Sequence, residues 1–261
     1  MLQRYDAVRF IKVLESGRTQ PLLLECECVS EDDHSRKTFV VKAPGLPEVE
    51  DFGLFSELFS YLLAEELEIE TPHAALIDLS EEFVEIVNPI LRKWNLAVES
   101  GVGFGSEYMG PGFVAASGTE FLNPEELAGA LQLFSFDLLI QNPDRIPNNP
   151  NCAYKDGNYI AFDFNLAFSF LLLIGNANEP WEFSKHQIAE EHLFYSSLRR
   201  KVLDYKPFIA KLEKLSGARV EEMLDLVPFG SEFYKNKVRE HLASIVENAA
   251  KLEIELQRSL L

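Results

Sequence analysis

Hydrophobic and polar residues alternate along much of the first half of the chain, which is the pattern of strands with one buried face. Strands are expected at 4–14, 20–30, 38–42, 74–79 and 101–109. The polar segment 15–19 separates the first two and predicts a hairpin turn. Apolar residues recur with a helical period over 54–67 and around 81–94, and we expect the latter to break at Asn88-Pro89 because proline disrupts a helix interior.

The pattern turns mainly helical beyond residue 112. Asn123-Pro124 is a favourable helix start, and the buried stripe that follows reaches about Gln141. A polar loop at 142–151 leads into a hairpin over 152–164. Further helices are expected at 186–201, 206–215, 219–226 and 232–258. The sequence therefore predicts an α+β fold of two lobes with a cleft between them, a β-rich N-terminal lobe over 1–112 and a mainly helical lobe over 113–261.

Charge narrows the range of ligands. The chain has 24 basic and 42 acidic residues, a net charge of −18. Residues 1–181 account for all of it, with 11 basic and 29 acidic side chains (11 − 29 = −18), since 182–261 carry 13 of each. Binding to nucleic-acid phosphates needs an excess of Lys and Arg, so a direct nucleic-acid ligand is not expected. The longest apolar run, 167–175, is half the length needed to span a bilayer, and the N-terminus lacks a signal-peptide core, so we expect a cytoplasmic protein without membrane contact.

The cysteines and histidines do not suggest a metal enzyme. Cys26 and Cys28 lie two apart in an alternating apolar run, which places both on one face of a strand. We interpret them as core residues, because the sequence has no second ligand pair to complete a metal site. The histidines show none of the spacings of zinc hydrolases, which argues against zinc catalysis.

The polar loop and the hairpin after it carry the chemistry. Asp144 follows a buried helix, Asn149 comes five residues later, and Asp163 lies in the apolar run IAFDFNLAF on the far arm of the hairpin. Phosphoryl transfer from ATP needs one carboxylate to orient the attacking hydroxyl, and a second carboxylate with an amide oxygen to hold Mg²⁺. The same residue types are also common turn formers, but an Asp within an apolar run needs a partner such as a metal ion.

The first half supplies two further candidates. Lys42 ends the apolar strand TFVV, and Glu57 lies fifteen residues later in the following helix. Such a pair would hold a lysine against the α- and β-phosphates of ATP. Taken singly, each also fits a simpler interpretation, a strand-end lysine reaching water or a solvated helix face. The order Lys, Glu, Asp, Asn, Asp favours the functional interpretation.

These residues, with the segments LFSELFSYLLAEEL, FGSEYM, FDLLIQNPDRIPNN and IAFDFNLAF, resemble the HipA-like kinases, bacterial protein kinases of the toxin–antitoxin type with a two-lobed kinase fold. The catalytic loop is also similar to that of type II phosphatidylinositol 4-kinases. The resemblance implies that Asp144 is the catalytic base and that Asn149 and Asp163 ligate Mg²⁺. It implies that Lys42, braced by Glu57, contacts the ATP phosphates. The hinge strand that meets adenine would be Glu107, Tyr108 and Met109.

Three features depart from the usual kinase pattern. Asn142-Pro143 stands where His-Arg precedes the catalytic Asp, and Asp163-Phe164-Asn165 ends without the usual Gly. The phosphate-binding loop has the single glycine Gly17.

The function expected from the sequence is therefore an ATP- and Mg²⁺-dependent HipA-like protein Ser/Thr kinase. Its expected partners are a protein substrate and an operon-encoded regulator or antitoxin. The alternatives are a pseudokinase binding module in a toxin–antitoxin or defence system, and a lipid or small-molecule kinase.

Overall fold

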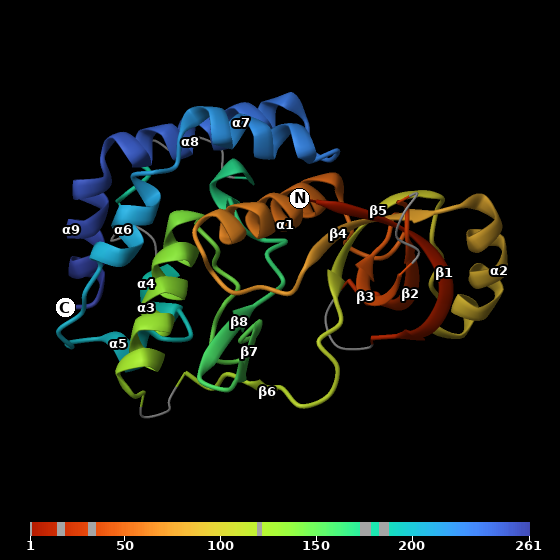
Figure 1. The fold of residues 1–261 in the computed structure, drawn as a ribbon, viewed down its shortest axis with the longest axis horizontal. Coiled ribbons are helices and arrows are strands. Elements are labelled where there is room, and N and C mark those ends of the chain that lie inside the picture. The colour runs from red at the N-terminus through yellow and green to blue at the C-terminus, as the bar shows by residue number, and fades with distance from the viewer. Residues whose placement is uncertain (1, 15–18, 31–34, 119–121, 173–178, 183–187) are drawn as a thin grey trace. The chain divides into compact units, whose positions relative to one another are not determined.

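The computed structural model describes residues 2–14, 19–30, 35–118, 122–172, 179–182 and 188–261. The chain divides into two compact units. The first comprises Met1–Leu54 and Pro72–Gly110, and the second comprises Phe55–Thr71 and Pro111–Leu261. Figure 1 draws the helices and strands of both.

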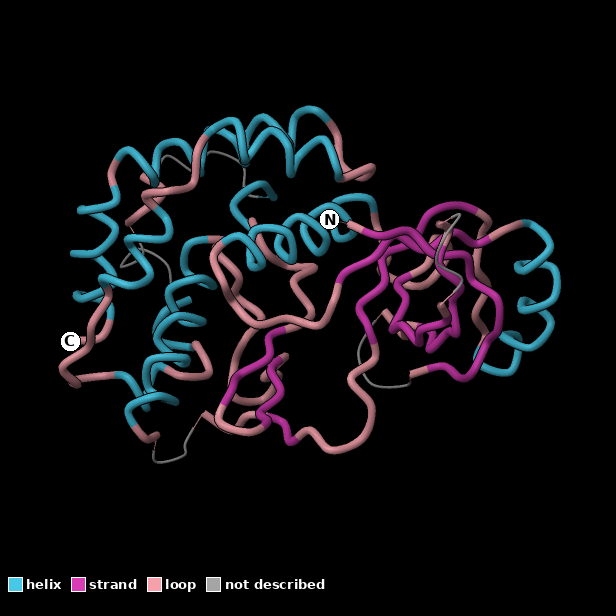
Figure 2. The backbone as a smooth tube through the Cα atoms, in the orientation of Figure 1, coloured by secondary structure: helices cyan, strands magenta, loops and turns pink. Residues whose placement is uncertain are grey.

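The first unit contains a closed barrel in which hydrogen-bonded neighbours follow the order β1, β2, β3, β5, β4. Its strands are the magenta segments of this unit in Figure 2. The strands are β1 (Gln3–Val13), β2 (Leu22–Cys28), β3 (Arg36–Lys42), β4 (Ala74–Leu79) and β5 (Gly101–Glu107). Neighbouring strands are antiparallel except β1 and β4, which run parallel. The predicted strands are confirmed, with ends that shift by up to a few residues.

Alternation along the strands explains where the barrel core lies. Leu24 on β2 pairs in register with Phe10 on β1 and Phe39 on β3, and Leu24 and Phe39 are fully buried. Cys26 and Cys28 point into the same core as free thiols, which confirms their interpretation as core residues. Burial raises the pKa of the Cys26 thiol to about 12, so this sulfur stays protonated.

Helix α2 (Glu81–Leu91) covers the barrel with Phe83, Val87 and Leu91. These residues lie four apart in the sequence and therefore share one face of the helix. The predicted break at Asn88-Pro89 is wrong. The helix continues through Pro89 to Leu91, and the short 3₁₀ helix η1 (Arg92–Trp94) follows. Pro89 lies in the last turn of α2. The Asn88 side chain stabilises this end by bonding both the N–H and the C=O of Val98, at 2.8 and 3.0 Å.

The second unit is mainly helical and contains a small sheet of order β6, β7, β8. Its helix α1 (Asp51–Glu66) begins in the first unit. The other elements are β6 (Val114–Ala115), α3 (Pro124–Leu139), β7 (Cys152–Lys155), β8 (Asn158–Ala161), η2 (Ser169–Leu172), α4 (Ile188–Glu191), α5 (Tyr195–Leu198), α6 (Lys206–Leu212), α7 (Gly217–Leu226), α8 (Glu232–Glu247) and α9 (Ala249–Ser259).

The helix start predicted at Asn123-Pro124 is confirmed. Asn123 caps α3 by accepting hydrogen bonds from the N–H groups of Glu125 and Glu126, and the Asn123 N–H donates in turn to the Glu126 carboxylate. Two helix predictions are wrong. The 186–201 segment contains the separate short helices α4 and α5, with 183–187 outside the described residues. The 232–258 segment divides at Asn248, whose side chain donates to the Ser244 carbonyl at 2.8 Å and ends α8.

Aromatic side chains form much of the core of the second unit. On α1, Phe55 stacks on Tyr234 of α8, and Tyr61 meets Phe164 edge-on with ring centroids 5.3 Å apart. Phe164 directly follows Asp163 and also meets Phe136 of α3. The segment that carries Asp163 is thus packed between α1 and α3.

His241 on α8 provides a pH-dependent contact within this core. Its Nε2 lies 2.7 Å from the carbonyl oxygen of Leu139 at the end of α3, and burial lowers its pKa to about 4. An unfolded histidine titrates near 6.5. Between about pH 6.5 and 4 the unfolded chain binds a proton that the folded chain excludes, so stability falls as the pH is lowered. We expect the free energy of unfolding to drop by about 2 kcal/mol from this residue between about pH 7.5 and 5.

Urea unfolding at both pH values tests this prediction. His241→Gln keeps an N–H donor for Leu139 but does not titrate, so its loss between the two pH values should be smaller by about that amount. An equal loss in the variant and the wild type would assign the pH dependence to other groups.

Candidate functional site

A tight turn after α3 assembles the candidate site. The segment Ile146-Pro147-Asn148-Asn149 closes on itself through backbone bonds in both directions between Ile146 and Asn149, at 3.0 and 3.2 Å. Proline at the second position of such a turn presets its backbone angle. The turn brings Asn149 back beside Asp144.

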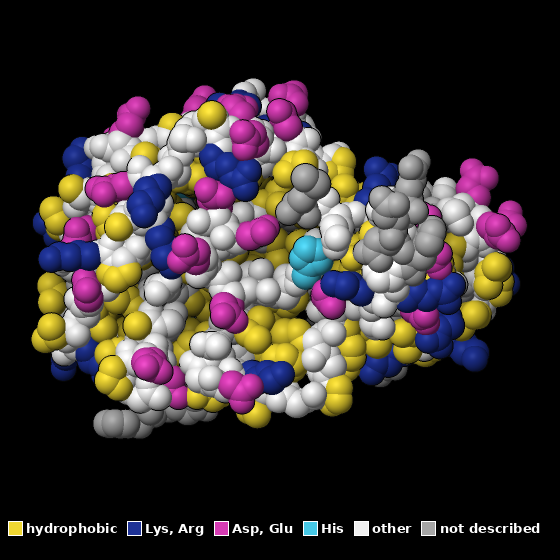
Figure 3. Space-filling model, in the orientation of Figure 1, with side chains coloured by type: hydrophobic (Ala, Val, Ile, Leu, Met, Phe, Trp, Pro, Cys, Tyr) yellow, Lys and Arg dark blue, Asp and Glu magenta, His cyan; other side chains and the backbone are white. Residues whose placement is uncertain are grey.

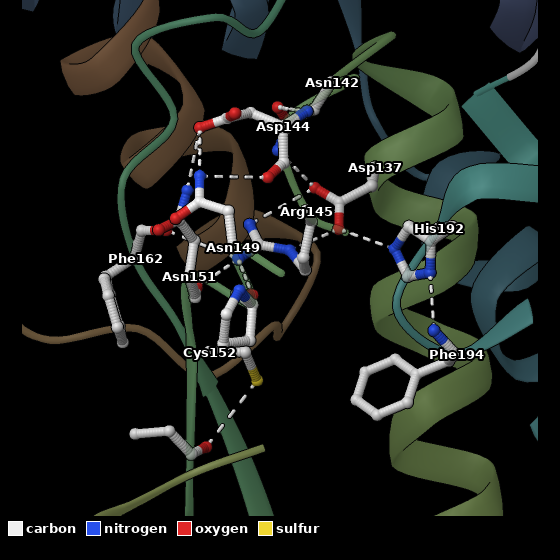
Figure 4. Close-up of polar contacts among 12 residues, drawn as sticks. Asp137, Asn142, Asp144, Arg145, Asn149, Asn151, Cys152, Phe162, His192 and Phe194 are labelled. Carbon is white, nitrogen blue, oxygen red and sulfur yellow. Dashed lines mark hydrogen bonds and ion pairs between the residues drawn. The ribbon is translucent and has the colours of Figure 1, made fainter. Parts of the chain in front are cut away.

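Asp144 is half-buried and is held by two asparagine side chains. The Nδ2 atoms of Asn149 and Asn151 both donate to its Oδ2, each at 2.9 Å (Figure 4). The Asn142 side chain accepts a bond from the Asp144 N–H at 3.2 Å. One carboxylate oxygen is therefore fixed by amides, which orients the other. Because Nδ2 of Asn149 bonds Asp144, Oδ1 is the atom of this amide that can serve a cation.

Asp163 follows β8 at the end of the hairpin. Its backbone has φ of +60°, a left-handed conformation that Asp adopts more readily than bulkier residues. The N–H of the preceding Phe162 donates to the Asn151 carbonyl at 3.0 Å, which ties this turn to the Asp144 loop. Asp163 is half-buried, less enclosed than its apolar neighbours in the sequence suggested.

The negative charges of Asp144 and Asp163 repel each other across the site. Burial raises the pKa of Asp144, and the negative charge of Asp163 adds to the rise, while hydrogen bonds from Asn149 and Asn151 oppose it. A pair of nearby carboxylates in a half-buried site gains from a bound cation.

The donor set fits Mg²⁺. The Asp163 carboxylate and the Asn149 amide oxygen are hard oxygen ligands, and Mg²⁺ keeps several waters or phosphate oxygens in its shell. Within the described part of the chain there is no group of three or more His, Cys, Asp and Glu side chains that could hold a metal by themselves. A metal at Asn149 and Asp163 would therefore depend on phosphate and water for its other ligands.

A buried ionic network underlies the loop, and the sequence analysis missed it. Arg145 and Asp137 are fully buried and paired, with Nε 2.5 Å from Oδ2. Asp137 also accepts from Asn142 at 2.8 Å and lies 3.1 Å from Nε2 of His192 (Figure 4). The Phe194 N–H donates to Nδ1 of His192 at 3.1 Å, so Nε2 carries the proton that faces Asp137.

The pKa values of this network keep Asp137 ionised and His192 neutral. Burial alone would raise the pKa of Asp137, but the charge of Arg145 and the hydrogen bond from His192 outweigh it and hold the pKa below its usual value. Burial lowers the pKa of His192 despite Asp137. A carboxylate in the apolar helix segment FSFDLL was a signal for a buried partner, by the argument that drew attention to Asp163. Nothing local in the sequence marks His192.

Two of the predicted ATP-binding residues, Lys42 and Glu57, are buried. Lys42 ends β3 and is 7% exposed, and Glu57 on α1 is 1% exposed. Both are therefore enclosed rather than solvated, which removes the simpler interpretation of each. Their pairing stays a prediction. Gly17 lies outside the described residues.

The predicted hinge follows the end of β5. The N–H of Glu107 donates to the His73 carbonyl and that of Tyr108 to the Thr38 carbonyl, both at 2.8 Å. The Glu107 carboxylate pairs with Lys37 at 2.9 Å. These two N–H groups are used within the barrel, so an N–H contact to adenine in this segment would come from Met109.

The α+β fold and the loop that brings Asn149 beside Asp144 agree with the kinase class expected from the sequence. The chain belongs to the HipA-like kinase family, whose family model matches residues 7–228. The crystal structure of the Helicobacter pylori proinflammatory kinase CtkA is similar in fold, with a TM-score of 0.55 and 14% sequence identity over 99% of each chain. A search of curated proteins gives no match.

The family match confirms the resemblance found in the sequence. The likeness of the loop to type II phosphatidylinositol 4-kinases stays a prediction. In the described parts of the chain, every helix is too short or too polar to cross a membrane.

Proposed function

We propose that this protein is an ATP- and Mg²⁺-dependent Ser/Thr protein kinase that transfers the γ-phosphoryl group of ATP to a protein hydroxyl. One observation carries the proposal: Asp144 is oriented by Asn149 and Asn151 beside Asp163, all in one half-buried site. The proposal includes a two-lobed kinase arrangement, with a nucleotide-binding lobe over 1–112 and a catalytic lobe over 113–261. It places the protein in the cytoplasm.

Each residue has a task in this mechanism. Asp144 would orient the attacking hydroxyl and accept its proton at Oδ1, the carboxylate oxygen that the asparagines do not bond. Asn149 and Asp163 would hold Mg²⁺, which when bound neutralises charge on the β- and γ-phosphates. Lys42, braced by Glu57, would bind the phosphates together with Gly17. Glu107, Tyr108 and Met109 would hold adenine.

A pseudokinase is the second candidate. The single glycine of the Gly17 loop favours it, because phosphate-binding loops usually need more glycines for their backbone to approach the phosphates. The complete Asp144, Asn149 and Asp163 set opposes it. A lipid kinase is less favoured. Anionic lipids attract a basic surface, and this chain has a net charge of −18. On the face drawn in Figure 3, the Lys and Arg side chains of the second unit are interspersed with Asp and Glu.

The acceptor class is tested by incubating the protein with Mg²⁺ and ATP labelled on the γ-phosphate. Three acceptors are offered in parallel: the protein itself with a basic Ser/Thr peptide, phosphatidylinositol vesicles, and water alone. We expect label on serine or threonine. Label only in lipid would replace the proposed substrate class, and tight nucleotide binding without any transfer would identify a pseudokinase.

Nucleotide binding should depend on the metal. A ligand that binds only the folded state raises the melting temperature by mass action, and ATP at about 100 times its Kd adds roughly 2.7 kcal/mol of stability. We expect a clear rise of Tm with Mg²⁺ and ATP together and a smaller one with ATP and EDTA. Asp163→Asn should reduce the first rise to the level of the second. A wild-type Tm that ATP leaves unchanged in both conditions contradicts this prediction.

The acidic surface selects among partners. With −18 overall, the protein attracts basic surfaces and repels acidic ones. We therefore propose that the substrate protein, and an operon-encoded regulator or antitoxin, present a basic face.

A further inference from the structure

The side chain of Arg145 joins the two segments that carry the candidate metal and base residues. Its Nη1 donates to the Asn151 carbonyl on the Asp144 loop and, at 3.3 Å, to the Phe162 carbonyl next to Asp163. Its guanidinium carbon lies 5.0 Å from the ring centroid of Phe164, on the other side of Asp163. One buried cation thus contacts the residues on both sides of Asp163 and the residue that holds Asp144.

The Asn151 carbonyl accepts two hydrogen bonds that link the two segments. It accepts from Arg145 and also from the Phe162 N–H at 3.0 Å. The Asn151 side chain donates to Asp144. Motion of the guanidinium would therefore displace the hydrogen bond to Asp144 and the turn at Asp163 together.

Asp137 on α3 fixes the orientation of the guanidinium. Its carboxylate accepts hydrogen bonds from Nε of Arg145 at 2.5 Å and from Nη2 at 3.3 Å, so both bonds lie along one edge of the planar group. The remaining Nη1 is then directed at the two carbonyls. Asp137 is itself held by Asn142 and His192, which leaves the guanidinium little freedom to rotate.

Stability alone does not account for such a residue. Replacing a buried ion pair by well-packed apolar side chains is often neutral or stabilising, because desolvating the charges is costly. Apolar side chains cannot bond the carbonyls of two segments at fixed directions, whereas the rigid fork of an arginine can. The geometry is the property that requires arginine here.

Building on the proposed function, we propose that Arg145 is a positioning residue for phosphoryl transfer. It holds Asp163 at a fixed distance from Asp144 and Asn149, and it acts through Asn151 and Phe162 without touching ATP, metal or acceptor. Loss of this link is expected to weaken the use of Mg²⁺ more than the binding of the nucleotide base.

Arg145→Lys tests the role, because lysine keeps the charge opposite Asp137 but lacks the fork. Arg239→Lys is the matched control, since Arg239 forms an exposed ion pair with Glu221 on helices away from the loop. We expect kcat to fall about 10- to 100-fold in Arg145→Lys, with a similar rise in the Mg²⁺ concentration for half-maximal rate. The KM for ATP at saturating Mg²⁺ should change far less, and Arg239→Lys should match the wild type.

Amide hydrogen exchange gives a readout that does not depend on activity. The Phe162 N–H bonds the Asn151 carbonyl, so its exchange should be about tenfold faster in Arg145→Lys and unchanged in the control. Wild-type exchange together with wild-type kcat and Mg²⁺ dependence in Arg145→Lys would overturn the inference.

A second variant, Phe164→Leu, tests the same role if Arg145→Lys does not fold. Phe164→Leu removes the ring beside the guanidinium but none of its hydrogen bonds, and it should raise the half-maximal Mg²⁺ concentration by about threefold. No change in a folded Phe164→Leu protein would overturn the inference when Arg145→Lys does not fold. A wild type that transfers no phosphate refutes the proposed function and the role in transfer. The exchange rates then still decide whether Arg145 fixes the two segments.

Discussion

Replacing Asp144 by asparagine is expected to lower the rate of phosphoryl transfer by a factor of about 10²–10⁴, the usual contribution of a general base. Asparagine has nearly the same shape, and its Oδ1 can still accept from Asn149 and Asn151, so the loop should keep its conformation. It cannot accept a proton from the attacking hydroxyl. The measurement is the initial rate of label transfer from ATP, with Tm recorded for each protein.

Asp156→Asn is the matched control, because Asp156 is exposed at the tip of the β7–β8 hairpin and Asn-Gly suits that turn as well as Asp-Gly. It should transfer phosphate at the wild-type rate. Asp144→Asn should keep the Mg²⁺-dependent rise of Tm with ATP. Transfer by Asp144→Asn at the wild-type rate would remove Asp144 from the mechanism.

Asp137→Ala is expected to lower the free energy of unfolding by about 3–5 kcal/mol, because it leaves the fully buried charge of Arg145 without its counter-ion. Urea unfolding at neutral pH measures this change. Glu221→Ala provides the control, since it breaks an exposed pair with Arg239 and should change the free energy of unfolding far less. Similar losses in both variants would contradict the assignment of Asp137 as the centre of a buried network.

The same network predicts the direction of a pH effect. The folded state holds the pKa of Asp137 below its usual value, so its contribution is present above about pH 4 and is lost as the pH falls through the lowered pKa. His192 acts in the same direction, because its pKa is also lowered in the fold and the unfolded chain takes up its proton first. Asp137→Ala removes the first of these two contributions and leaves the second.

Local sequence patterns predicted the parts of the site that depend on neighbouring residues. The turn that returns Asn149 to Asp144 is set by Pro147 and the asparagines around it, and the Asp-Gly turn sets the hairpin that leads to Asp163. The barrel strands followed from short apolar runs bounded by turn residues, and buried positions alternate most regularly in β4. These features need little information from the rest of the chain.

The network behind the loop could not be predicted in this way. Asp137 meets Arg145 across eight residues of chain and His192 across fifty-five, so the contacts exist only after the helices pack. The apolar segment around Asp137 indicates that this carboxylate needs a partner, but it does not identify Arg145 or His192. The continuation of α2 through Pro89 likewise depends on the bonds between Asn88 and Val98, a contact between two separate segments.

In the proposed mechanism, Asp144, Asn149 and Asp163 form the phosphoryl-transfer centre. The most direct test is mass spectrometry of the intact protein and a basic Ser/Thr peptide after incubation with ATP carrying an isotopically labelled γ-phosphate. We predict that the wild type with Mg²⁺ transfers the labelled phosphate to a hydroxyl, and that Asp163→Asn, or the wild type with EDTA, does not. Equal labelling in all three samples, or a folded wild type that binds Mg²⁺ and ATP but labels no acceptor, would contradict the claim.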